Sequence, residues 1–190
     1  MTVPHATTPE VDQMRQRARD HIEEGAVTAG YAADREAVLK RLDEALATEL
    51  VCVLRYRRHH FMARGILSQA VAEEFLAHSN EELGHADLLA GRIVQLGGEP
   101  DLAPATLASR SHAEYLEGTT LSDMIKENLV AERIAIDSYR DFIAYLGDKD
   151  PTTRRLLETI LATEEEHADD LTSLLRVIPQ MAAPPAVRAH

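Results

Sequence analysis

Four long segments of this chain repeat apolar residues at steps of three and four, which is the period of an α-helix. They cover about residues 34–64, 67–96, 122–147 and 150–178. Aromatic residues make up only 4% of the chain, and it contains no Trp. This composition favours helices over sheets. We therefore predict an all-α fold built from four long helices.

The lengths of the connections predict how these helices pair. Only short turns, around Gly65 and around residues 147–149, separate the first helix from the second and the third from the fourth. Each pair should therefore form an antiparallel hairpin. About 25 residues separate Leu96 from Ser122. Two hairpins joined by one long crossover make the four-helix bundle that is typical of ferritin-like proteins.

The same signals divide the chain into three parts. We expect an N-terminal extension over residues 1–33, in which residues 10–24 could form a short helix. The bundle should cover residues 34–178, and a proline-rich tail follows over 179–190. Within the bundle, Ser122 is the expected N-cap of the third helix. Asp150, followed by Pro151, is the expected N-cap of the fourth.

Each predicted helix places a glutamate in the middle of its apolar stripe, and two helices add a histidine three residues later. Burying one unpaired carboxylate costs several kcal/mol, so it is rarely done without compensation. Four carboxylates at a similar depth require a shared cause. The residues concerned are Glu49, Glu82, His85, Glu132, Glu164 and His167.

Two metal ions would supply that cause. Residues three apart on a helix lie on one face, so each Glu-x-x-His motif can present both side chains to one ion. Four carboxylates balance the charge of two divalent cations. Oxygen-rich ligands with one imidazole per metal suit iron or manganese better than a structural zinc. Cys52 is the single cysteine, which excludes a cysteine-rich zinc site.

The two halves of the chain also repeat each other. The glutamates within a half are 33 residues apart in the first hairpin and 32 in the second. Tyr56 and Tyr139 each follow the first glutamate of their half by seven residues, and both histidines are followed by Ala-Asp. This repetition makes a chance origin of the six-residue pattern hard to sustain.

With these residues in view, the chain resembles bacterioferritins over about residues 39–175. The segments EELGHADLLAGRIVQLGGEPDL and ATEEEHADDL carry the similarity. The resemblance implies a di-iron site with Glu82 and Glu164 able to bridge the metals, and Glu49 and Glu132 as terminal ligands. His85 and His167 would each bind one metal. Tyr56 matches a tyrosine beside that site, although it could equally be a core residue whose hydroxyl is satisfied.

The resemblance further implies a ferroxidase, which oxidises Fe(II) to Fe(III) with O₂ or H₂O₂ and stores or detoxifies iron in a homo-oligomeric shell. Bacterioferritins bind haem through a methionine that is replaced here by Leu83, so we expect no haem. The fifth helix of 24-subunit ferritins is not predicted. A twelve-subunit shell like that of Dps-like mini-ferritins is therefore favoured, although Cys52 lacks the partner cysteine common in that group.

Charge and hydropathy bear on DNA binding and on the cellular location of the protein. The formal net charge of −12 repels nucleic acid and attracts cations, so a DNA-protecting role is disfavoured. A di-metal peroxidase, manganese catalase or oxygenase remains an alternative, with manganese in place of iron. No apolar run is long enough to span a membrane and no secretory signal is present, so we expect a cytoplasmic protein.

His78 lies on the same stripe, one turn before Glu82. A histidine there is more often a hydrogen-bonded core residue than a third metal ligand. The sequence leaves both readings of His78 open.

Overall fold

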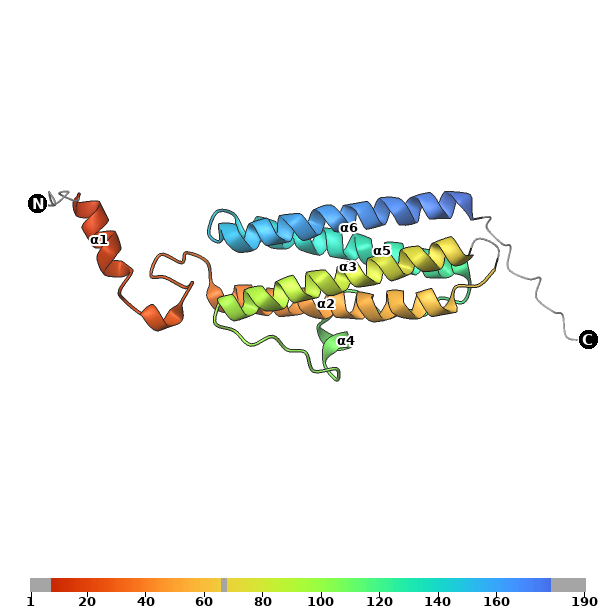
Figure 1. Ribbon diagram of the computed structural model, residues 1–190, viewed down its shortest axis with the longest axis horizontal. Helices are drawn as coiled ribbons and strands as arrows, with labels where there is room; N and C mark the ends of the chain where they lie inside the picture. The colour runs from red at the N-terminus through yellow and green to blue at the C-terminus, as the bar shows by residue number, and fades with distance from the viewer. Residues whose placement is uncertain (1–7, 66–67, 179–190) are drawn as a thin grey trace, which may run out of the picture.

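The computed structural model describes residues 8–65 and 68–178, and within these ranges it contains helices and no strands. Four long helices form the body of the molecule (Figure 1). This confirms the predicted all-α four-helix bundle. The helices are α2 (Arg35–Met62), α3 (Ser68–Gln95), α5 (Leu121–Leu146) and α6 (Pro151–Val177).

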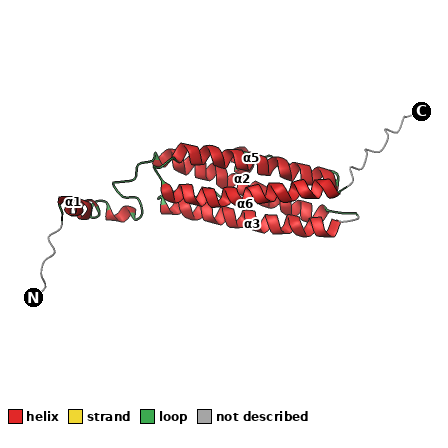
Figure 2. Cartoon of the chain, turned by 90° about the horizontal axis from the view of Figure 1, so that it is seen from above, coloured by secondary structure: helices red, strands yellow, loops and turns green. Residues whose placement is uncertain are grey.

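The helices pair as two hairpins. Helix α2 packs chiefly against α3, and α5 chiefly against α6, while α2 also contacts α5 and α3 contacts α6. The four long helices lie side by side in the view from above (Figure 2). The crossover between α3 and α5 runs back along the bundle and carries the short helix α4 (Leu107–Arg110) (Figure 1). Neighbouring helices are therefore all antiparallel, as the connection lengths predict.

The crossover is attached to α2 along most of its length. Its backbone and side chains exchange hydrogen bonds with α2 residues that are spread over four turns of the helix. These bonds are Arg110 Nη1 to the Asp43 carbonyl (3.0 Å), the His112 N–H to Thr48 Oγ1 (2.9 Å), Arg55 Nη1 to the Glu114 carbonyl (2.8 Å) and His59 Nε2 to the Glu117 carbonyl (3.0 Å).

The helix ends follow local capping chemistry. The prediction of Ser122 as the N-cap of α5 is wrong by two residues. Thr120 is the N-cap, because its hydroxyl accepts from the Asp123 N–H while the Asp123 carboxylate accepts from the Thr120 N–H. Asp150 caps α6 as predicted, accepting from the Thr153 N–H at 2.9 Å. The predicted start of the second helix, at residue 67, lies outside the described residues.

The N-terminal extension is less helical than predicted. Helix α1 covers only Pro9–Arg17, and a separate 3₁₀ turn, η1, covers Ile22–Glu24. Between them, His21 has a left-handed backbone (φ 52°), which a continuous helix does not contain. None of the α1 residues is buried, and both elements project beyond the end of the bundle (Figure 1). The predicted C-terminal tail, residues 179–190, lies outside the described residues.

The core consists of two apolar clusters separated by a polar layer. In α2, Leu46 belongs to one cluster, Cys52 belongs to the other, and Glu49 lies between them. The other three helices show the same order, each with its own glutamate between the clusters. In the described part of the chain, no helix is long and apolar enough to cross a membrane. The fold thus places four carboxylates at one level of its interior.

Candidate metal centre

The six predicted side chains meet at this polar layer, one glutamate from each helix and one histidine each from α3 and α6. All six are buried, and the most exposed of them, His85, keeps only 7% of its surface accessible. They form two groups, and within each group the candidate ligand atoms lie within 4.8 Å of one another. The first group is Glu49, Glu82, His85 and Glu164, and the second is Glu82, Glu132, Glu164 and His167.

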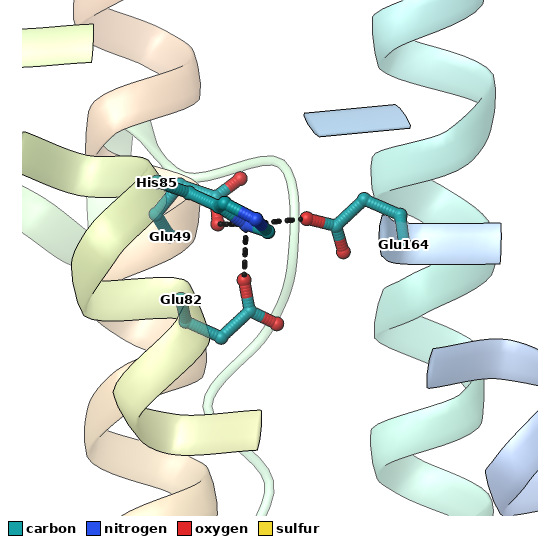
Figure 3. Close-up of side chains that lie close together, drawn as sticks. All are labelled: Glu49, Glu82, His85 and Glu164. Atoms are coloured by element: carbon teal, nitrogen blue, oxygen red, sulfur yellow. Dashed lines mark hydrogen bonds and ion pairs between the residues drawn. The ribbon is translucent and has the colours of Figure 1, made fainter. Parts of the chain in front are cut away.

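His85 is the centre of the first group. Its Nδ1 atom lies 2.9 Å from Glu164 Oε1, 3.2 Å from Glu82 Oε2 and 3.4 Å from Glu49 Oε2. Figure 3 shows the imidazole between the three carboxylates, with Glu164 reaching it from the opposite hairpin. One imidazole and three carboxylates from three helices therefore converge on a single point.

The second group is looser. The Nδ1 atom of His167 lies 3.6 Å from Glu82 Oε1 and 3.8 Å from Glu132 Oε2. Glu82 and Glu164 belong to both groups, whereas Glu49 and Glu132 belong to one each. Shared carboxylates are the ones that could bridge two ions, so a bridging role for Glu82 and Glu164 stays a prediction.

Unpartnered polar atoms provide the test of whether metal ions fit here. Buried carboxylate oxygens and imidazole nitrogens normally have hydrogen-bond partners, and each one without a partner needs an explanation. Five such atoms occur in the two groups. They are Glu49 Oε2, Glu82 Oε1, Glu132 Oε2, Glu164 Oε1 and His167 Nδ1. All of them are metal-ligating atoms, so the side chains present fit two divalent cations.

Without metal, this layer holds protons. Burial and the nearby charge of Glu82 raise the pKa of Glu49 and of Glu164 well above the usual range. Burial alone would lower the pKa of His85, but the nearby carboxylates of Glu49 and Glu82 raise it to about 9. In the same way, Glu132 and Glu82 outweigh burial and raise the pKa of His167 to about 11. Binding of metal ions must therefore displace protons.

Two tyrosines hold the terminal glutamates across the bundle. The Tyr56 hydroxyl, on α2, donates to Glu132 Oε1 on α5, and the Tyr139 hydroxyl, on α5, donates to Glu49 Oε1 on α2. Burial and the charge of the glutamate it contacts raise the pKa of each phenol, so both stay protonated donors. The two tyrosines, each seven residues after a glutamate, thus form a reciprocal pair of hydrogen bonds between α2 and α5.

Sequence reasoning singled out Tyr56 as a site residue and missed Tyr139. The signal was available, because Tyr139 has the same position relative to Glu132 as Tyr56 has relative to Glu49. Cys52, the single cysteine, is buried and belongs to one of the two apolar clusters of the core. Burial raises the pKa of its thiol.

Glu81 fixes the orientation of His167. The His167 Nε2 atom lies 2.6 Å from Glu81 Oε2, and the carboxylate can only accept there. In the neutral ring that a metal ion would bind, the proton on Nε2 leaves the lone pair on Nδ1, which faces Glu82 and Glu132. Metal-binding histidines are commonly oriented by such a carboxylate.

We expect Glu81→Gln to weaken metal binding by roughly 10–100-fold, because the amide orients His167 poorly. Isothermal titration with Co(II) measures the change. The control is Glu73→Gln, an exposed glutamate on the same helix outside both groups. Equal affinities in the two variants would contradict a positioning role for Glu81.

Comparison with known proteins agrees with this geometry. The sequence profile of the ferritin-like domain matches residues 39–181, which include all six side chains of the centre. The chain belongs to the ferritin-like family. The resemblance to bacterioferritins inferred from the sequence is confirmed.

Within the ferritin-like family, the chain is similar to proteins of several kinds. It is 30% identical to the bacterioferritin of Mycobacterium avium over 76% of this chain and 87% of that protein. It is 34% identical to the DNA protection during starvation protein of Pyrococcus furiosus, covering 70% and 74% of the two chains. Among solved structures, the dodecameric thioferritin of Bacteroides fragilis, a bacterioferritin-related protein, matches with a TM-score of 0.74 and 32% identity, covering 76% of this chain and 88% of that one.

Proposed function

We propose that this ferritin-like protein is a ferroxidase that binds two Fe(II) ions in the polar layer and oxidises them. The two overlapping groups that share Glu82 and Glu164 are the observation that carries the proposal. Buried ligand atoms without hydrogen-bond partners among the described residues support it, because two metal ions would satisfy them. Iron is here the substrate, and manganese is the alternative metal for the same ligand set.

The reaction balances with either oxidant. Two Fe(II) ions lose one electron each, and O₂ takes up both electrons and two protons to leave as H₂O₂. With H₂O₂ as oxidant, two electrons and two protons cleave the O–O bond and give two water molecules. No electron donor other than the iron is required.

The protein contributes position, charge balance and exclusion of water. Glu82 and Glu164 would hold the ions close together, and four carboxylates would compensate their charge. Oxidation to Fe(III) adds positive charge, which oxygen ligands stabilise better than nitrogen or sulfur ligands do. Tyr56 and Tyr139 would keep Glu132 and Glu49 oriented while the metals change charge.

Anaerobic titration of the metal-free protein with Fe(II), followed by oxidant, tests the proposal. Two irons per chain should bind in the polar layer, and ferric absorbance should then rise rapidly. Double replacement of Glu49 and Glu132 by Gln should slow that rise and remove tight binding. Weak binding at a single site with no rapid oxidation would contradict the ferroxidase proposal.

The same preparation distinguishes the other di-metal function. A manganese catalase would evolve O₂ from H₂O₂ when loaded with manganese. Ferroxidase activity consumes H₂O₂ without evolving O₂. We expect iron-dependent consumption only.

A shell of twelve subunits is the assembly that we propose. The dodecameric thioferritin of Bacteroides fragilis supports it, since that structure matches most of this chain. The expected fifth-helix region, after residue 178, lies outside the described residues. Light scattering on the purified protein separates a dodecamer of about 250 kDa, twelve times 21.0 kDa, from a shell of twice that mass.

DNA binding is not part of the proposal. The relative from Pyrococcus furiosus is named for DNA protection, but the net charge of this chain is −12. Arginines 15 and 17 of α1 are accompanied by acidic residues at positions 10 and 12 of the same helix. A salt-sensitive gel shift at physiological ionic strength would overturn this reading.

A further inference from the structure

A third cluster of metal-ligating side chains lies beside the centre. His78 on α3 is buried, with 2% of its side chain exposed, and Glu74 lies one turn earlier on the same helix. Asp170 reaches the cluster from α6 and is 57% exposed. One candidate ligand atom from each residue lies within 4.8 Å of the other two. The cluster thus extends from the interior to the surface between α3 and α6.

The hydrogen bonds of Tyr56 determine which nitrogen of His78 faces this cluster. Tyr56 has one hydroxyl proton, and it donates that proton to Glu132. Its oxygen, 3.3 Å from His78 Nδ1, therefore accepts from the imidazole. The proton on Nδ1 leaves the lone pair of the neutral ring on Nε2.

Nε2 of His78 is a buried atom without a hydrogen-bond partner in the described part of the chain. It lies 3.3 Å from Glu74 Oε1 and 3.9 Å from Asp170 Oδ2, with a geometry that makes no hydrogen bond to either. Three groups with lone pairs thus face one another. The buried His78 nitrogen without a partner is unfavourable, and a cation between the three groups would satisfy it.

We propose that Glu74, His78 and Asp170 form a third divalent-cation site, separate from the two-metal centre. One imidazole and two carboxylates suit Fe(II), Mn(II), Co(II) or Zn(II), and the exposed side leaves room for water ligands. The His78 ring stacks on the His167 ring with centroids 4.0 Å apart. Only the stacked His78 and His167 rings would separate an ion at this site from the two-metal centre. A substrate ion could therefore bind here before it enters the centre. That role rests on the proposed ferroxidase function, whereas cation binding does not.

Equilibrium dialysis of the assembled full-length protein against Co(II) under nitrogen tests the site. We expect three Co(II) per chain in the wild type. Glu74→Gln and Asp170→Asn should each lose one equivalent, while Asp169→Asn should keep all three. Asp169 is exposed and adjacent in sequence, and its replacement removes the same charge. Glu74 and Asp170 lie at the surface, so neither variant threatens the core.

The variants separate failure of this site from failure of the centre. Glu82→Ala removes a ligand that the two central groups share and should leave the third equivalent in place. If one Co(II) binds to the wild type and Asp170→Asn removes it, the third site is right and the two-metal proposal is wrong. If two bind, and Glu82→Ala alone reduces that number, the third site is refuted. Equal losses in Asp170→Asn and Asp169→Asn would refute it too, since they would indicate non-specific attraction to surface charge.

Discussion

Replacing Glu82 by alanine is expected to abolish rapid Fe(II) oxidation, with a loss on the order of 100-fold or more. Replacing a residue that only orients a metal ligand typically lowers metal affinity or activity about 10–100-fold. Glu82 is itself a candidate ligand, shared by both groups, so its loss should have a larger effect. Glu164→Ala should behave in the same way for the same reason. Stopped-flow absorbance after mixing Fe(II)-loaded protein with O₂ measures the rate.

These variants should still fold without metal, because the histidines that face the replaced carboxylate can release their protons and become neutral, which a guanidinium cannot do. Circular dichroism and thermal unfolding of the metal-free proteins check this. Glu166→Ala is the matched control, since it is an exposed glutamate two residues from Glu164. It should leave both oxidation and folding unchanged. A metal-free Glu82→Ala protein that fails to fold would show that the glutamates serve structure.

Asp150→Ala should lower the free energy of unfolding by about 3–5 kcal/mol, the typical cost of removing one partner from a buried ion pair. Asp150 receives hydrogen bonds from Arg92 Nη2 at 3.0 and 3.1 Å and from the Tyr31 hydroxyl at 2.9 Å. It also caps α6 through the Thr153 N–H. Alanine would leave the Arg92 guanidinium buried without a counter-charge at the end of the bundle.

Urea denaturation of the metal-free protein measures this loss. Asp150→Asn keeps a cap acceptor and loses the charge, so its free energy of unfolding should lie between those of Asp150→Ala and the wild type. Arg154→Ala breaks an exposed pair with Glu158 and should cost at most about 1 kcal/mol. A loss below about 1 kcal/mol for Asp150→Ala would contradict the central role of this network.

The bundle and its six convergent side chains could be predicted because helical periodicity is a strong signal. Positions three and four apart share a face, so a glutamate within an apolar stripe must lie inside the bundle. Connection lengths then determine which helices are neighbours. The helix ends were harder to predict: Thr120 is the cap because it pairs with Asp123, and Ser122 two residues later is chemically as suitable.

Contacts between helices could not be predicted, because periodicity specifies a face and a height but not the opposing residue. The donation from Tyr139 to Glu49 depends on the separation of α2 and α5. The position of Asp170 near His78 depends in the same way on the packing of α3 against α6. The sequence therefore left His78 as a core residue or a ligand, and only the arrangement in space favours the second reading.

The attachment of the crossover to α2 makes two faces of the bundle different. The two halves of the centre are chemically alike, but the long connection covers the α2 face, and no described segment covers the α3–α6 face in the same way (Figure 1). Among the described residues, His167 contacts an exposed carboxylate, Glu81, whereas the carboxylates beside His85 are all buried. In a two-metal centre of the proposed kind, the two positions would therefore differ in their connection to the surface, although the ligands around them are nearly the same.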